Sequence, residues 1–176
     1  METLLLGSSA VLSVGSLLFS LVMIYAGIMD LTTMKIRNVL VLALVVLYCV
    51  VAPFSALSWS EIGWSVAVAL GVFVLTFIFF FLGWIGGGDA KLAAAAALWF
   101  GAGASLPFFI WTAVLGGVLT LALLLFRSWL LPASLAGIPW IERLHEKRGG
   151  IPYGAAMAPA ALIVLPQTPW MIGGFF

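Results

Sequence analysis

Long apolar runs separated by short polar interruptions make up most of this sequence. Uncharged apolar runs of about 18 residues or more are typical of transmembrane helices, whereas a transmembrane β-barrel shows short segments of alternating polarity. We therefore expect an all-α fold: a polytopic integral membrane protein with six transmembrane helices in a single domain over residues 1–176. The expected spans cover residues 11–29, 39–51, 62–82, 90–100, 108–126 and a proline-interrupted stretch that begins near 151.

The boundary between the fourth and fifth spans follows from length. No charged residue occurs between Leu92 and Phe126. A single helix over that stretch would be about 52 Å long, whereas the hydrocarbon core of a bilayer is about 30 Å thick. The chain must therefore turn, and we expect the turn within Gly101–Pro107, where glycine and proline are concentrated.

Composition supports a membrane protein and excludes other classes. Hydrophobic residues form 65% of the chain and charged residues 7%, whereas about a quarter of the residues in a soluble domain are charged. The first apolar run has no basic residues before it, so we expect a retained helix rather than a signal peptide. A net charge of +1 without a dense basic cluster gives no indication of nucleic-acid binding. The lone cysteine, Cys49, excludes an internal disulfide and a cysteine-based zinc site.

The basic residues are confined to alternate connections of the six-span arrangement, 30–38, 83–91 and 127–150. They are Lys35, Arg37, Lys91, Arg127, Arg143, Lys147 and Arg148. Because positively charged loops stay in the cytoplasm, we expect these connections inside and both termini on the non-cytoplasmic side. Four tryptophans near the span ends are expected to anchor in the lipid headgroups, namely Trp59, Trp64, Trp140 and Trp170. The alanine-rich fourth span suits close packing in the centre of the bundle.

This orientation brings two aspartates to the same, cytoplasmic, side. Asp30 follows the first span, and Asp89 follows three glycines at the start of the fourth. A carboxylate next to hydrocarbon is costly and indicates a function. The structural alternative for Asp89 is an N-cap of the fourth span. For Asp30 the alternatives are a cap of a turn at Thr32 or Thr33, or an ion pair with Lys35.

Two facing carboxylates provide the chemistry of peptide hydrolysis. Like charges a few ångströms apart cannot both ionise cheaply, so such a pair shares a proton. The ionised group acts as general base on a water molecule, and the protonated group assists the carbonyl oxygen and later the leaving nitrogen. This chemistry requires no metal, cofactor or nucleophilic side chain, and we expect none. The glycines Gly86, Gly87 and Gly88 would allow an extended peptide backbone to approach closely.

Other polar residues are interpreted more simply. Lys91 either stabilises the charged form of Asp89 or, as we favour, extends to the headgroups. His145, flanked by Glu142 and Glu146, offers a weak metal site, but a solvated helix in the membrane interface is the favoured interpretation.

At these residues the chain resembles the type IV prepilin peptidases, particularly the short members that serve Flp/Tad-type pili. Gly86-Gly87-Gly88-Asp89-Ala90-Lys91 matches the family's Gly-x-Gly-Asp-x-Lys motif. Asp30, followed by Ile36 and Asn38, matches an aspartate, five residues, then Ile-Pro-Asn, with Arg37 in place of the proline. Ile151-Pro152-Tyr153-Gly154 resembles a further family segment.

The resemblance implies an aspartic endopeptidase of the bacterial cytoplasmic membrane, with Asp30 and Asp89 as catalytic residues. Its substrate would be a prepilin or pseudopilin helix in the lipid membrane, cleaved after a glycine at the cytoplasmic edge. We assign substrate contacts to Gly86–Gly88, Lys91 and Asn38. Longer family members carry an extra cysteine-containing region and also methylate the new N-terminus, so methyltransferase activity is not expected here.

Two other classes of protein remain as alternatives. Presenilin-like intramembrane proteases also use Gly-x-Gly-Asp, but they pair it with Tyr-Asp and Pro-Ala-Leu segments. Here Asp30 follows Met29, and residues 159–162 read Pro-Ala-Ala-Leu. A small proton- or cation-coupled transporter would use the aspartates to bind its ion and would place polar residues in mid-span, where this sequence has few.

Overall fold

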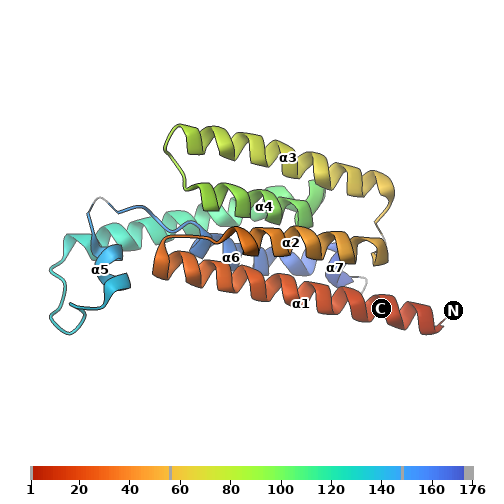
Figure 1. Cartoon of the computed structure of the whole chain (residues 1–176), viewed down its shortest axis with the longest axis horizontal. Coiled ribbons are helices and arrows are strands. Elements are labelled where there is room, and N and C mark those ends of the chain that lie inside the picture. Colours follow the sequence, from red (N-terminus) through yellow and green to blue (C-terminus); the bar gives the residue numbers. More distant parts are fainter. Residues whose placement is uncertain (1, 56, 148, 173–176) are drawn as a thin grey trace.

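The computed structural model describes residues 2–55, 57–147 and 149–172 as a bundle of helices, and no strand occurs in these ranges. Its elements are α1 (Glu2–Thr33), α2 (Asn38–Val51), η1 (Ala52–Phe54), α3 (Trp59–Phe81), α4 (Gly87–Ser128), α5 (Pro139–His145), α6 (Gly154–Val164), η2 (Leu165–Gln167) and α7 (Pro169–Ile172). The long helices run along one common axis, with α5 at one end of the bundle (Figure 1). Among the basic residues used to orient the chain, Arg148 lies outside the described residues.

Three helical stretches of the described chain are long and apolar enough to cross a membrane: Ser9–Thr33, Trp59–Phe81 and Gly87–Ser128. Two shorter apolar helical stretches, Asn38–Phe54 and Gly154–Gln167, accompany them. The all-helical class expected from the apolar runs is confirmed, and the number of membrane crossings stays a prediction.

The third of these stretches folds back on itself at Gly101. This glycine has φ 57° and ψ −162°, a conformation that side chains rarely adopt. Ser105 Oγ donates to the Ala97 carbonyl at 3.4 Å, and the rings of Phe100 and Phe108 stack at 4.8 Å. Residues eight positions apart in a straight helix would lie about 12 Å apart. The expected turn is therefore confirmed, and Figure 1 shows the two parts of α4 running in opposite directions.

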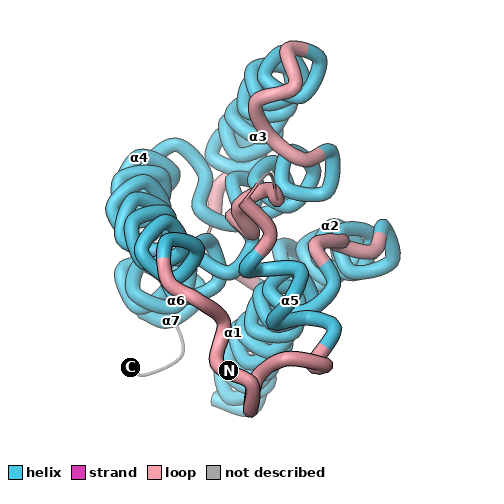
Figure 2. Tube along the Cα trace, turned by 90° about the vertical axis from the view of Figure 1, so that its left-hand side faces the viewer, coloured by secondary structure: helices cyan, strands magenta, loops and turns pink. Residues whose placement is uncertain are grey.

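The first part of α4 lies in the centre of the bundle, as its alanines predicted. Its buried residues include Ala93, Ala96 and Trp99. Around Trp99 pack the aromatic rings of Phe19, Tyr48 and Trp170. Helix α3, by contrast, stands at the edge of the bundle, away from α1 (Figure 2), and exposes a row of large apolar side chains, as expected of a lipid-facing helix.

Two sequence-based expectations need correction. Trp170 is not a headgroup anchor, because only 1% of it is exposed and its Nε1 donates to the Trp99 carbonyl at 2.6 Å. The first helix does not end before Asp30 but continues to Thr33. The backbone bonding continues past Asp30, whose carbonyl accepts from the Met34 N–H at 2.8 Å, and the hydroxyls of Thr32 and Thr33 donate to the carbonyls of Ile28 and Met29, one turn earlier. Asp30 therefore lies inside the last turn of α1.

Candidate active site

Asp30 is buried where the end of α1 meets the start of α6. Only 4% of the residue is exposed, and its Oδ2 accepts a hydrogen bond of 2.7 Å from the Gly154 N–H. The Ala155 N–H also interacts with this carboxylate. The first N–H groups of a helix have no partner within the helix and attract negative charge. The α6 N-terminus thus offsets the unfavourable dipole at the end of α1.

Close packing of α1 on α6 makes this contact possible. A Cβ on Gly27 would meet the Ala158 Cβ at 2.8 Å and the Gly154 carbonyl oxygen at 3.2 Å. A Cβ on Gly154 itself would lie 2.9 Å from Asp30 Oδ2 and 2.9 Å from the Ile36 side chain. Glycine at both positions therefore sets the depth at which Asp30 meets the α6 N-terminus.

Asp89 lies in the first turn of α4, as its third residue. The helix begins at Gly87 with Gly86 as its cap residue, so the expectation that Asp89 precedes the helix as its N-cap needs correction. Its carboxylate instead folds back toward the Gly86 N–H, and a Cβ on Gly86 would lie 2.9 Å from Asp89 Oδ2. Asp89 Oδ1 is buried and has no hydrogen-bond partner among the described residues. One acceptor of Asp89 is therefore left for a group that is not part of the chain.

The fold brings these two carboxylates together, although they come from different helices. The backbone N–H of Gly154 interacts with both of them, and the charge of Asp30 acts on Asp89. Both residues line one cavity of about 510 Å³. Its other walls are the loop before α4 and the segment before α6, with the lining residues Met34, Gly83, Trp84, Ile85, Gly86, Gly149, Gly150, Ile151 and Tyr153. A pair of carboxylates in a partly enclosed cavity can activate water and protonate a leaving group.

A buried arginine holds one wall of this cavity in place. Arg127, 7% exposed, donates Nε to the Leu144 carbonyl at 2.7 Å, Nη1 to Gly149 at 2.9 Å and Nη2 to Gly150 at 2.8 Å. The guanidinium thus ties the connection after α4 to the cavity-lining glycines. Sequence reasoning used Arg127 only as a marker of orientation. Its position at the end of α4, where basic side chains bond free carbonyls, was the only available signal.

The residues expected to contact substrate divide into two groups. Gly86 lines the cavity. Gly87 and Gly88 lie in packing contacts instead: a Cβ on Gly87 would meet the Phe80 ring at 3.1 Å, and one on Gly88 would meet Ile36 at 3.0 Å. Lys91 Nζ donates to Asn38 Oδ1 at 3.0 Å, which joins α4 to the start of α2.

His145 and the neighbouring Glu142 contact other parts of the chain. His145 packs edge-on against the Phe126 ring at 5.0 Å, and Glu142 accepts a hydrogen bond from the Gly137 N–H at 2.8 Å. The described residues contain no group of three His, Cys, Asp or Glu side chains that could hold a metal ion.

The fold and the site together define a class of protein: an all-helical chain with membrane-length apolar helices and two carboxylates in one cavity. The family model described as the type IV leader peptidase family matches residues 17–121, a stretch that contains both Asp30 and Asp89. The match covers more than half of the chain, so this protein belongs to the type IV leader peptidase family. No curated protein and no solved structure matches the chain. Membership of the family implies a peptidase with a prepilin substrate, and together with the apolar helices it indicates a membrane protein.

Proposed function

We propose that the protein is an aspartic endopeptidase that removes the leader peptide from prepilins of the Flp/Tad type, with Asp30 and Asp89 as its catalytic pair. The observation that carries this proposal is the common environment of the two carboxylates. Asp30 accepts a hydrogen bond from the Gly154 N–H, the charge of Asp30 acts on Asp89, and both carboxylates line the same cavity. A purely structural role, as a helix cap for each aspartate, would not require them to line one cavity.

In the proposed reaction a water molecule lies between the pair and the scissile carbonyl. One carboxylate removes a proton from the water as the oxygen attacks the carbonyl carbon, and the other, protonated, donates to the carbonyl oxygen. The tetrahedral intermediate then collapses, the C–N bond breaks, and the leaving nitrogen takes a proton from the first carboxyl group. This differs from the expectation in which the second group also serves the nitrogen, because that group has already given its proton to the carbonyl oxygen. It regains a proton from a hydroxyl of the intermediate as the new carboxyl group forms. The products are a leader with a new carboxylate and a pilin with a new amine. No metal or cofactor takes part.

Gly86 is the glycine that we assign to substrate contact, because it lines the cavity beside Asp89. Gly87 and Gly88 support Gly86 indirectly, because their close packing against Phe80 and Ile36 fixes the start of α4. The Lys91–Asn38 hydrogen bond fixes the same region to α2. The positive-inside bias supports a cavity that faces the cytoplasm of a bacterium, where the leader of a membrane-bound prepilin would enter it.

The proposal is tested by a processing assay in detergent or proteoliposomes with a prepilin substrate. We expect Asp30→Asn and Asp89→Asn each to abolish leader removal, because an amide can neither accept the proton of water nor donate as an acid. Glu146→Gln is the matched control: it removes an exposed carboxylate outside the cavity and should cleave at the wild-type rate. Leader removal that persisted in either aspartate variant would exclude the pair as the catalytic groups.

A further inference from the structure

A second cavity, distinct from the one that contains the carboxylates, lies between the end of α1 and α5. It has a volume of about 610 Å³ and is lined by Thr32, Thr33, Met34 and Lys35 from the α1 side and by Pro139, Trp140 and Arg143 from α5. The two elements are tied together across it, because Arg143 Nη1 donates to the Thr32 carbonyl at 2.7 Å. The cavity is thus a built junction between two helices.

The charged residues that line this cavity are both basic. Lys35 and Arg143 both line it, and no Asp or Glu appears among its described lining residues. The neighbouring Glu142 is engaged elsewhere, with the Gly137 N–H. A guanidinium carries five N–H donors, and beyond the bond to Thr32 those of Arg143 have no partner among the described residues. Two cations without a carboxylate make a site for an anion, and the arginine fork suits a phosphate group in particular.

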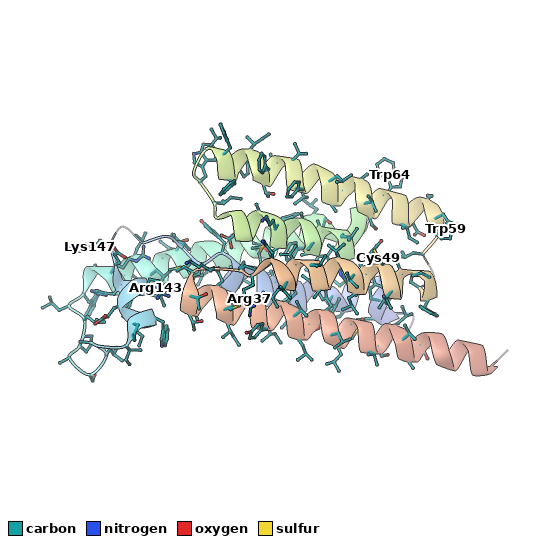
Figure 3. The ribbon with its side chains drawn as sticks, in the orientation of Figure 1. Arg37, Cys49, Trp59, Trp64, Arg143 and Lys147 are labelled. Atoms are coloured by element: carbon teal, nitrogen blue, oxygen red, sulfur yellow. The ribbon has the colours of Figure 1, made fainter. Side chains whose placement is uncertain are left out.

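The position of the cavity points to the source of that phosphate. It lies directly after the membrane-length stretch Ser9–Thr33. Trp140, 39% exposed, contributes to its wall, and tryptophan is enriched at the headgroup level of membranes. Figure 3 shows Arg143 at the end of the bundle where Lys147 lies, whereas Trp59 and Trp64 lie at the opposite end. Basic pockets between helices on the cytoplasmic side of a membrane bind the headgroups of anionic lipids.

We propose that this cavity binds the phosphate headgroup of one anionic phospholipid, held by Lys35 and Arg143 beside Trp140. The lipid would bridge the end of α1 and α5, and so stabilise the turn of α1 that carries Asp30. This inference depends on the chain lying in a membrane and not on the peptidase chemistry. It can therefore be correct or wrong independently of the proposed cleavage.

The test is a lipid titration of the purified full chain in neutral detergent, followed by native mass spectrometry of the one-lipid complex. We expect phosphatidylglycerol to bind more tightly than phosphatidylcholine. The double variant Lys35→Gln/Arg143→Gln should weaken phosphatidylglycerol binding by about tenfold. The matched control, Arg37→Gln/Lys147→Gln, removes the same charge from two exposed residues outside the cavity and should change binding by less than about twofold.

If both double variants weakened phosphatidylglycerol binding equally, the effect would come from general surface charge, and the proposal would be wrong. Equal binding of phosphatidylglycerol and phosphatidylcholine would also overturn it. Glycerol phosphate that displaced the lipid at equal concentration would show a site for free phosphate and overturn the lipid assignment. The single variant Lys35→Gln keeps the Arg143–Thr32 bond and thus guards against a folding defect; we expect about threefold weaker binding. An Asp30→Asn protein should retain lipid binding while it cleaves nothing, which separates the two proposals.

Discussion

The backbone N–H group of Gly154 fixes the position of the Asp30 carboxylate. Gly154 donates to Asp30 Oδ2 at 2.7 Å and also interacts with Asp89. Because this donor is a main-chain group at the start of a helix, no side-chain motion can withdraw it. Its geometry depends on the missing side chain at position 154, where a Cβ would lie 2.9 Å from Asp30 Oδ2.

The contact between Gly154 and Asp30 predicts how a single methyl group at position 154 changes the processing rate. Gly154→Ala should lower the processing rate by about tenfold or more, because displacement of a catalytic group by a fraction of an ångström is costly. Gly117→Ala is the matched control, since a Cβ there meets nothing within 4 Å. Processing rates and thermal unfolding are measured for both variants. Normal processing by a folded Gly154→Ala protein would show that the pair tolerates a shift of its shared partner.

At the scale of elements, the connection between α4 and α6 is organised by one arginine. Arg127 satisfies three carbonyls at once, and two of these belong to cavity-lining glycines. The site therefore depends on a contact between the end of one helix and the segment before another. This dependence explains how a connection rich in glycine and proline forms a defined wall.

Arg127→Lys tests this contact while it preserves the charge. A lysine ammonium lacks the planar fork that reaches three carbonyls. We expect a loss of stability of about 1–3 kcal/mol, because the buried Leu144 carbonyl and the part-buried carbonyls of Gly149 and Gly150 lose their donor. Amide hydrogen exchange over residues 149–151 should accelerate, because that segment loses its tether. Arg37→Lys, at an exposed position, should leave both measurements unchanged. Unaltered exchange in Arg127→Lys would show that the wall is held by other contacts.

The helices themselves could be predicted from the sequence, and the contacts between them could not. Apolar runs, proline positions and the length argument predicted the helical class and a turn within Gly101–Pro107, whereas the structure turns at Gly101 and is helical again before Pro107. The resemblance to known motifs singled out Asp30 and Asp89. The Gly154 partner, the Arg127 contacts and the burial of Trp170 were missed, because each joins residues far apart in the chain. Local periodicity carries no information about which distant carbonyl or amide a side chain will meet.

For the whole molecule, the charge distribution makes a prediction about the membrane. In Figure 3, Arg143 and Lys147 lie at the α5 end of the bundle, Arg37 lies between them and the opposite end, and Trp59 and Trp64 lie toward that opposite end. If positive loops stay inside, the cavity of Asp30 and Asp89 faces the cytoplasm. A leader peptide would then reach the carboxylates without crossing the bilayer.

Thiol labelling in cells tests this orientation. In a Cys49→Ser background, we expect Lys147→Cys to be shielded from a membrane-impermeant reagent until the membrane is opened. Ser60→Cys, at the opposite end, should react in intact cells. Both positions are exposed in the fold, so a difference in labelling reports the side of the membrane. Labelling of Lys147→Cys in intact cells would reverse the orientation and place the cavity outside.

A double-variant cycle tests whether Asp30 and Asp89 act as one catalytic unit. Single-turnover leader cleavage is measured for the wild type, Asp30→Asn, Asp89→Asn and the double variant, since residues that act as a unit show strongly non-additive effects. If the two carboxylates act as one unit, each single variant falls to the background rate and the double variant is no slower. A single variant that retained cleavage within about tenfold of the wild type, or losses that simply added, would contradict this interpretation.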